Sequence, residues 1–350
     1  MTTTTAERPG DTPAAKPAAT APERERSIPR AGWMVIAAKE FGDHLLSSRF
    51  FVLVLIMAIA AAVPLYFLGN VIRQAAESAG NQPALFAALF AASPPVNDQI
   101  TLPSVTGFLA LVGPLLGLAF AFDSINGERA NGTLPRLLSQ PIHRDDVVNG
   151  KFAAGLAVIS LVLVVMLLGV TAFALIRLGI VPQASEILRV LLWALVTIIY
   201  IGLWLAFGML LSVAIRRAAT SALVGFGIWL LLTIFGGLIV SLLSGVLAPM
   251  GATAEEELRN IGIREALIRL QPNNLYQETA FALLNPLETS VSTPDTIGSY
   301  VQRQEQIPNT LFSVDQSLML VWPQVVTLFA LMVACFAAAY VLFMRQEVRA

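Results

Sequence analysis

Residues 152–176 read FAAGLAVISLVLVVMLLGVTAFALI, and no Asp, Glu, Lys or Arg interrupts them. An α-helix needs about 20 predominantly apolar residues to cross the hydrocarbon layer of a bilayer, so this stretch is long enough to do so. Lipid cannot hydrogen-bond to open backbone groups, and the stretch lacks the alternating pattern of a barrel strand. We therefore expect it to form a membrane-spanning helix.

Five further stretches share this length and this absence of charge. They are residues 50–72, 99–122, 190–215, 218–254 and 316–344. Charged residues make up only 13% of the chain, about half the share usual for soluble domains, whereas hydrophobic residues make up 56%. The sequence therefore predicts an all-α integral membrane protein with six transmembrane helices, for which the lipid bilayer is the first partner.

The reactive and charged residue types exclude several classes of function. A formal net charge of −1 provides no basic surface for nucleic acid. The chain has one cysteine, Cys335, and its two histidines, His44 and His143, lie far apart in the sequence, so we expect no internal disulfide and no metal site built from these residues. Neither a zinc-protease helix motif nor a nucleophile-elbow motif is present, so we expect no catalytic residues and no enzyme.

The sequence also lacks the residues that two energy sources, a proton gradient and ATP, would require. A proton-driven carrier needs carboxylates or histidines within the membrane, and the six charge-free stretches contain none. A phosphate-binding loop needs the pattern G-x-x-x-x-G-K-[ST], whereas the Gly150–Lys151 pair is followed by Phe152. We therefore expect this chain to bind no cofactor. If ATP drives the protein, the ATP and its magnesium must be bound by another subunit.

The chain divides into five predicted segments. Residues 1–31 form a disordered cytoplasmic tail, 32–49 an interfacial helix, 50–247 the first five spans, 248–317 an extracytoplasmic helical subdomain, and 318–350 the sixth span with a short cytoplasmic end. The tail is too polar to offset its ordering cost. Trp33, Ala37, Phe41 and Leu45 form one apolar stripe, which favours a helix in the membrane interface, although the stripe could also pack against the spans.

The segment between the last two spans has helix signals of its own. Thr253 and Glu256 match a capping box, and the helix that they begin should end before Pro272. A shorter apolar run at 83–92 is too short to cross a bilayer and should form an interfacial or re-entrant helix.

The distribution of Lys and Arg predicts the orientation of the chain in the membrane. With the N-terminus inside, the inner side carries Lys39, Arg49, Arg129, Arg136, Arg144, Lys151, Arg216, Arg217, Arg345 and Arg349, and the short outer loops carry Arg73, Arg177 and Arg189. Short cytoplasmic loops are enriched in these residues. We therefore expect a multi-pass protein of the cytoplasmic membrane with both termini in the cytoplasm.

Residues 123–151, DSINGERANGTLPRLLSQPIHRDDVVNGK, form the longest inner loop between spans. The pairs Asn126–Gly127 and Asn131–Gly132 are typical of turns. Thr133 can cap a short helix whose apolar face, suited to a partner, comprises Leu134, Leu137 and Leu138. The alternative is an ordinary solvated connection.

This loop resembles that of permeases of the type-two export class of ATP-binding-cassette (ABC) transporters. The family pattern, approximately D-x-I-x-G-E-R-x-x-G-T-L followed by a Leu pair, Ser, Pro and Gly-Lys, is matched by Asp123, Ile125, Gly127, Glu128, Arg129, Gly132, Thr133, Leu134, Leu137, Leu138, Ser139, Pro141, Gly150 and Lys151. Residues 37–50 and 270–286 are also similar to family segments. Within the class, the chain is similar to the permeases linked to multicopper-enzyme or nitrous-oxide-reductase maturation. His143 stands where many members have Ser.

The resemblance implies a permease subunit, expected to export, that pairs with a second permease copy as a homodimer or heterodimer. Each copy would rest on an ABC ATPase subunit, with residues 123–151 as the coupling loop. Glu128 and Arg129 are then candidates for polar contacts with the ATPase, and the three leucines Leu134, Leu137 and Leu138 for apolar contacts. Alternatively, Glu128 and Arg129 pair with charges of this chain.

Two other functions remain open at this point. One is a carrier or channel that works without ATP. The other is a non-transporting scaffold or sensor that binds an extracytoplasmic protein through the outer segment. The glycines of the fifth span, Gly225, Gly227, Gly236 and Gly237, would permit close helix contact along a route or a dimer seam, or simply in packing.

Overall fold

The computed structural model describes residues 1–3, 32–79, 85–95, 100–135, 139, 142–249, 254–286 and 312–346, without the side chains of residues 70–79, 254–255 and 257–259. The chain separates into Met1–Ala31 and a compact unit, Gly32–Ala350, to which all helices below belong. The tail expected at 1–31 lies outside the described residues except for its first three.

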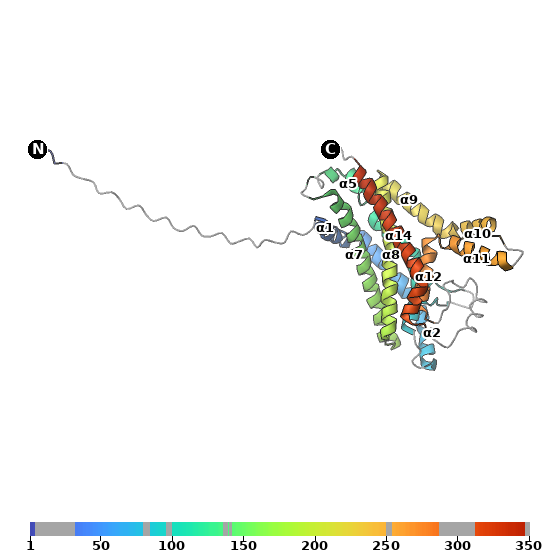
Figure 1. The fold of residues 1–350 in the computed structure, drawn as a ribbon. Coiled ribbons are helices and arrows are strands. Elements are labelled where there is room, and N and C mark those ends of the chain that lie inside the picture. The colour runs from blue at the N-terminus through green and yellow to red at the C-terminus, as the bar shows by residue number, and fades with distance from the viewer. Residues whose placement is uncertain are drawn as a thin grey trace. The chain divides into compact units, whose positions relative to one another are not determined.

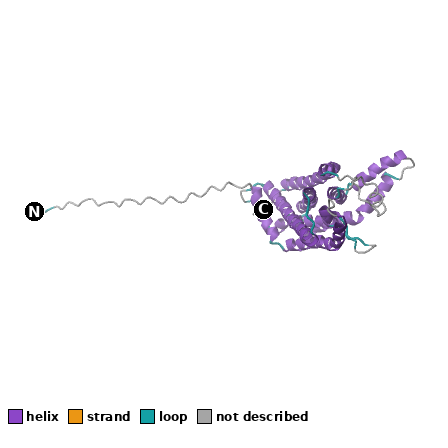
Figure 2. Ribbon diagram, turned by 90° about the horizontal axis from the view of Figure 1, so that it is seen from below, coloured by secondary structure: helices purple, strands orange, loops and turns teal. Residues whose placement is uncertain are grey.

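Among the described residues, six helices are long and apolar enough to cross a membrane, which agrees with the predicted number. Figure 1 shows their arrangement. They are α2 (Ser48–Ala79), α4 (Val105–Ala121), α7 (Arg144–Phe173), α8 (Ala184–Ala214), α9 (Ala218–Leu230) continuing into α10 (Gly236–Leu247), and α14 (Val314–Arg345). Two of them contain a π-helical turn, η1 (Ala174–Leu178) after α7 and η2 (Leu231–Phe235) between α9 and α10. Among the described residues, Figure 2 shows helices and loops and no strand.

Five shorter helices have their bounds within the described residues. They are α1 (Gly32–Leu45), α3 (Leu85–Ala91), α5 (Asn126–Ala130), α11 (Ala254–Ile268) and α12 (Pro272–Leu284). The helices expected near 33–46 and 83–92 are therefore present as α1 and α3. The helix stop expected before Pro272 is also found, because α11 ends at Ile268 and α12 begins at that proline. Thr253, the predicted cap, lies outside the described residues.

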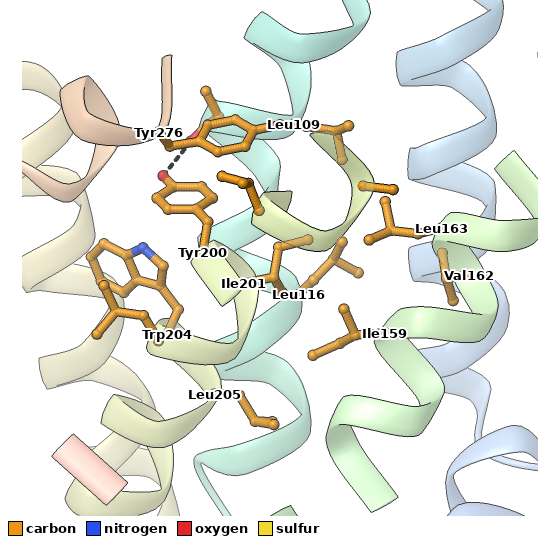
Figure 3. Packing of buried hydrophobic residues seen from close by; sticks show 14 of the residues in the cluster. Leu109, Leu116, Ile159, Val162, Leu163, Tyr200, Ile201, Trp204, Leu205 and Tyr276 are labelled. Atoms are coloured by element: carbon orange, nitrogen blue, oxygen red, sulfur yellow. Dashed lines mark hydrogen bonds between the residues drawn. The ribbon is translucent and has the colours of Figure 1, made fainter. Parts of the chain in front are cut away.

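The core is built around α8, which packs closely against α4 and α14. Gly117 permits the closest approach of α4, because a Cβ atom at this position would lie 2.6 Å from the Ile201 carbonyl oxygen. The Tyr200 ring stacks on Tyr276 of α12 with ring centroids 4.4 Å apart, and both side chains are buried (Figure 3). The α12 helix is thus part of the same core as the spans.

This placement changes the expected picture of residues 248–317. A small outer subdomain was predicted, whereas the described part consists of two helices with different surroundings. The α11 helix packs on α10, while α12 packs between α8 and α14. Thr279 and Leu283 of α12 have no exposed surface. In the described part of this segment, α12 therefore packs with the spans, whereas α11 packs on α10.

The α8 helix also starts earlier than its charge-free stretch and includes two buried charges. Glu186 is 5% exposed and accepts hydrogen bonds from the backbone N–H groups of Gln183 (2.9 Å) and Phe86 (2.8 Å). Arg189 is 3% exposed and donates to the Leu283 carbonyl oxygen at 2.9 Å. Arg189 was expected in a short outer loop. The structure corrects this, because the backbone groups around Arg189 satisfy its guanidinium within the protein.

Candidate functional site

The loop between α4 and α7 is fastened to the end of α8. Ser212 Oγ accepts hydrogen bonds from the N–H groups of Ile125 (3.0 Å) and Asn126 (3.2 Å). The Asn126 side-chain amide donates to the Ile215 carbonyl oxygen at 3.2 Å, and the residue is fully buried. These bonds explain a correction: Asn126–Gly127, expected as a turn, forms the start of α5. Gly127 of α5 lies against Asp123, which precedes the helix. A Cβ atom at Gly127 would be 3.6 Å from the Cβ atom of Asp123.

The predicted turn at Asn131–Gly132 is present after α5. Gly132 has a φ angle of 68°, which a residue with a side chain adopts only at a cost. Thr133 donates from both its N–H (3.0 Å) and its hydroxyl (3.2 Å) to the Glu128 carbonyl oxygen, so its side chain closes this turn. Residues 130–133 are exposed, and we refer to them as the loop tip.

A buried lysine joins the loop to two other helices. The Lys151 Nζ atom of α7 lies 2.7 Å from a carboxylate oxygen of Glu128 in α5 and 2.9 Å from one of Glu40 in α1. Only 4% of the Lys151 side chain is exposed, against 22% for Glu128 and 15% for Glu40. Because a buried ammonium group is costly unless it is paired, these two carboxylates account for its position.

Arg129 is held at the end of the last span. Its guanidinium donates to the side-chain oxygen of Gln346, just beyond α14. The Gln346 amide nitrogen donates in turn to the Val213 carbonyl oxygen of α8 at 3.0 Å. Arg144, the first residue of α7, donates to the Gln346 carbonyl oxygen at 3.4 Å. One glutamine therefore connects α5, α7, α8 and α14.

Asp123 joins the end of α4 to the start of α2. Its carboxylate lies 2.6 Å from the Arg49 guanidinium, which is also stacked over the Phe122 ring at 5.0 Å. Both charged side chains are partly exposed, so this ion pair lies at the edge of the site.

The α1 helix packs along the start of α7. The Trp33 N–H donates to Asp146 Oδ1 at 3.0 Å, and Ile36, 6% exposed, covers Gly150 so closely that a Cβ atom there would lie 2.7 Å from the Ile36 Cβ. His44 contacts the Phe120 ring edge with centroids 5.1 Å apart, and burial lowers its pKa below the ordinary value. The apolar stripe of α1 thus partly packs on the protein, while Trp33 remains 37% exposed.

The second oxygen of Asp146 shows how α7 begins after His143. It accepts the His143 N–H at 3.0 Å, so the aspartate closes the first turn, and the imidazole remains 90% exposed.

The structure therefore brings most of the predicted loop residues into one cluster. Asp123, Glu128 and Arg129 make contacts within the chain. Glu128 pairs with the charge of Lys151, as the alternative interpretation states, whereas Arg129 binds the uncharged Gln346 side chain. Leu134 is 1% exposed, whereas Leu137 and Leu138 lie outside the described residues. The sequence did not predict the contacts that Glu40, Arg49, Gln346 and Lys151 make at this site. Arg49, Lys151 and Gln346 share one sequence signal, because each lies within two residues of the end of a charge-free stretch, whereas Glu40 has no such signal.

Two other features concern ligands. In the described part of the chain, no group of three or more His, Cys, Asp or Glu side chains is placed to hold a metal ion. A largely apolar cavity of about 790 Å³ lies between α2 and α7, with Phe51, Met57 and Leu161 in its wall.

Comparison with known proteins agrees with this architecture. Residues 34–348 match the model of the family described as ABC-2 family transporter protein. A probable ABC transporter permease protein NosY of Stutzerimonas stutzeri is 29% identical over 145 residues, which cover 40% of this chain and 51% of the relative. The protein of the same name from Pseudomonas aeruginosa is 34% identical over 85 residues, 24% of this chain and 30% of the relative. The chain thus spans about half, or less, of the length of these relatives. It belongs to the ABC-2 transporter family, and parts of it resemble the NosY permeases.

Proposed function

We propose that this chain is a permease subunit driven by a separate ATPase subunit, which docks on the loop of residues 123–151, and that it exports its cargo from the cytoplasm. The observation that carries the docking proposal is the pairing of the buried Lys151 with Glu128 and Glu40. Through this pairing, the loop, the first helix and the third span are joined at one point.

An exposed loop tip that is joined to a buried contact, the Glu128–Lys151 pair, suits a coupling element. A partner that displaces residues 130–133 pulls on α5, and α5 cannot leave α7 without separating Glu128 from Lys151. Losing Glu128 costs about 1–3 kcal/mol, because Lys151 loses a charged hydrogen bond but keeps Glu40 as a partner. Movement of the tip is therefore transmitted to the helices rather than absorbed within the loop.

From this geometry we infer different roles for the candidate residues. Glu128 and Arg129 are positioning residues, because their side chains are bound within the chain. Asn131, Gly132 and Thr133 are exposed, so we expect them to contact the ATPase directly. Leu137 and Leu138 are included because of their sequence pattern. ATP and magnesium are then bound by the ATPase.

The proposed orientation of the chain in the membrane rests on the positive charges at this same end of the bundle. Arg49, Arg129, Arg144 and Lys151 gather there, and Lys and Arg are enriched on the cytoplasmic side. We therefore place both chain ends in the cytoplasm, α1 at the inner membrane interface, and the end of α12, which meets Arg189, toward the outside. A second permease copy would complete the transporter. Exposed apolar side chains of the fifth span, such as Leu223 and Leu242, are available for that copy or for lipid. The export direction is supported by the likeness of the loop to the export class.

Cross-linking tests the docking. In a Cys335→Ala background, which removes the one native cysteine, Asn131→Cys is expected to form a cross-link to the ATPase subunit that changes with ATP. Val181→Cys is the control, because Val181 is 75% exposed beyond the other end of α7. Equal cross-linking at both positions would remove the docking assignment.

Transport assays test the energy source. Vesicles that contain the permease and its ATPase should accumulate cargo only with ATP. Uptake by the permease alone, driven by a proton or sodium gradient, would instead establish a carrier that works without ATP.

A further inference from the structure

The cavity of about 790 Å³ between α2 and α7 is a groove that follows both helices. Its wall extends along α7 from Leu161 to Phe173 and along α2 from Phe50 to Tyr66. At a rise of about 1.5 Å per residue, the α2 side is about 24 Å long. Both helices are long and apolar enough to cross a membrane. We refer to this cavity as the α2–α7 groove.

The α2–α7 groove is closed by the protein core on one side and open on the other. Met57, Leu65 and Val170 line it and are 1%, 4% and 1% exposed, so they form its floor. Phe51 and Val165 belong to the same wall and are 62% and 55% exposed, so they lie at its open side. Because this side lies among apolar side chains of two spanning helices, it faces the hydrocarbon layer in a bilayer.

Small residues leave the space between the two helices open. Ala61 and Ala62 line the groove on the α2 side. Gly169 lines it on the α7 side, and a Cβ atom at this position would have nothing within 4 Å. Just past the groove the helices touch, because a Cβ atom at Gly69 would lie 3.5 Å from the Phe173 ring. The groove is therefore bounded at this end by a direct contact between α2 and α7.

The wall of the groove offers very little to a polar ligand. Among its described lining residues, Tyr66 has the one hydroxyl group, and none carries a charge. Water in a cavity needs about two to four polar partners, which this wall does not supply. An unfilled space would deprive the lining atoms of van der Waals contacts. A hydrocarbon ligand supplies these contacts without needing polar partners.

The dimensions of the groove favour an extended chain over a helix of a partner. A helix about 10 Å wide and about 24 Å long fills on the order of 1,900 Å³, more than twice the volume of about 790 Å³. A lipid chain of one leaflet spans about half of the roughly 30 Å hydrocarbon core, so it fits within the length of the groove.

Tyr66 also indicates where the headgroup of such a lipid would lie. It is 75% exposed at the end of the groove that is remote from the start of α2. Tyrosine is enriched where the hydrocarbon layer meets the headgroups, because its ring is apolar and its hydroxyl is polar. A chain that enters at this end therefore leaves its headgroup outside the groove.

We propose that the α2–α7 groove binds one acyl chain of a membrane phospholipid, whose headgroup remains outside at the Tyr66 end. Because the described wall carries no charge, the protein recognises the chain and not the headgroup. The proposal does not depend on ATPase docking or on the export direction, since it uses neither the loop of residues 123–151 nor the cargo.

Photolabelling of the purified full-length chain in detergent tests the proposal. The probe is phosphatidylcholine with a diazirine in one acyl chain, and the labelled peptides are located by mass spectrometry. Labelling of residues 50–66 and 161–173 should saturate as the probe concentration rises. Gly169→Leu, which fills the open space without meeting another atom at its Cβ position, should reduce this labelling at least 10-fold.

Gly227→Leu is the matched control, because Gly227 lies in the fifth span and also has nothing within 4 Å of its Cβ position. This variant should label as the unsubstituted chain does. Equal labelling of the groove in the two variants would overturn the proposal, and so would labelling that rises in proportion to the probe without saturating.

Competitors separate recognition of the chain from recognition of the headgroup. Unlabelled phosphatidylcholine and phosphatidylglycerol with the same acyl chains should displace the probe at similar concentrations. Glycerophosphocholine, which has no acyl chains, should not displace it. Displacement by this free headgroup, or a difference of more than 10-fold between the two lipids, would contradict the assignment of the acyl chain as the ligand.

A cysteine at the open side distinguishes a lipid chain from water and from a second copy of this protein. In a Cys335→Ala background, Ala62→Cys in permeabilised native membranes should resist a charged maleimide and form no disulfide-linked dimer. Val181→Cys, at a position 75% exposed beyond the end of α7, should be modified. Equally rapid modification of both would show a water-filled groove, and an efficient disulfide at Ala62→Cys would show that a second copy covers it. Either result would overturn the proposal.

Discussion

The ammonium group of Lys151 lies 2.7 Å from the Glu128 carboxylate, and only 4% of the lysine side chain is exposed. The two residues belong to different helices, and Glu40 of a third helix lies 2.9 Å from the same nitrogen. Since neither carboxylate can be removed without leaving the lysine underpaired, this cluster determines where the loop rests on the spans.

Replacement of Glu128 by Ala should destabilise the protein by about 1–3 kcal/mol, because Lys151 keeps Glu40 as a partner but loses a charged hydrogen bond. Thermal unfolding in nanodiscs measures the change. Asp43→Ala is the control. Its ion pair with Lys39 is on the surface, with side chains 62% and 66% exposed, so the variant should change stability by about 1 kcal/mol or less. Equal melting temperatures for both variants would refute the structural role of Glu128.

Substitution of Gly150 by Ala should loosen α1 from α7. The new Cβ atom would lie 2.7 Å from the Ile36 Cβ and 2.8 Å from the Trp33 carbonyl oxygen, so one helix must move. Overpacking of this kind costs about 1–3 kcal/mol. Faster hydrogen exchange in residues 32–45 would report it.

Gly169→Ala in the same helix is the comparison, because nothing lies within 4 Å of its Cβ position. This variant should be neutral or more stable by up to about 1 kcal/mol. Slower or unchanged exchange in Gly150→Ala would contradict the close packing of α1.

Removal of the Arg189 guanidinium should weaken the end of the bundle that is remote from the loop of residues 123–151. The group donates to the Leu283 carbonyl oxygen (2.9 Å), the Ser317 hydroxyl (3.0 Å) and the Phe312 carbonyl oxygen. Arg189→Leu leaves these acceptors buried, at about 1–3 kcal/mol for each unsatisfied group. Arg177→Leu, at an exposed position, should have little effect on the melting temperature. A similar loss in both variants would show that Arg189 is not a structural anchor.

His44 should make stability depend on pH. Burial lowers its pKa in the folded protein, so between the ordinary pKa of 6.5 and the folded value the unfolded chain binds a proton that the folded chain does not. Stability therefore falls as the pH decreases below about 6.5. His44→Phe, which keeps an aromatic ring against Phe120, should show a smaller loss of melting temperature between pH 7.5 and 5.5. An identical loss would assign the pH dependence to other groups.

Local patterns in the sequence predicted the spans well, whereas the site was predicted only in outline. Gly132 was correctly placed in a turn, because the preference of Asn-Gly pairs for turns is local. Asn126 was placed in a turn for the same reason, yet it starts a helix, because the distant Ser212 and Ile215 supply its hydrogen-bond partners. The loop residues were identified by family pattern, but their partners were not.

By itself, the amino-acid sequence determined that this protein has six membrane-crossing helices, because the thickness of a bilayer and its exclusion of charge act on each stretch separately. The sequence also showed that residues 123–134 resemble one family of permeases. Only the tertiary structure decided that Lys151 is paired with Glu128 and Glu40, that Arg189 is buried, and that α12 belongs to the core. These outcomes depend on which helix ends and side chains meet in space, and an ion pair between distant residues leaves no periodic signal along the chain.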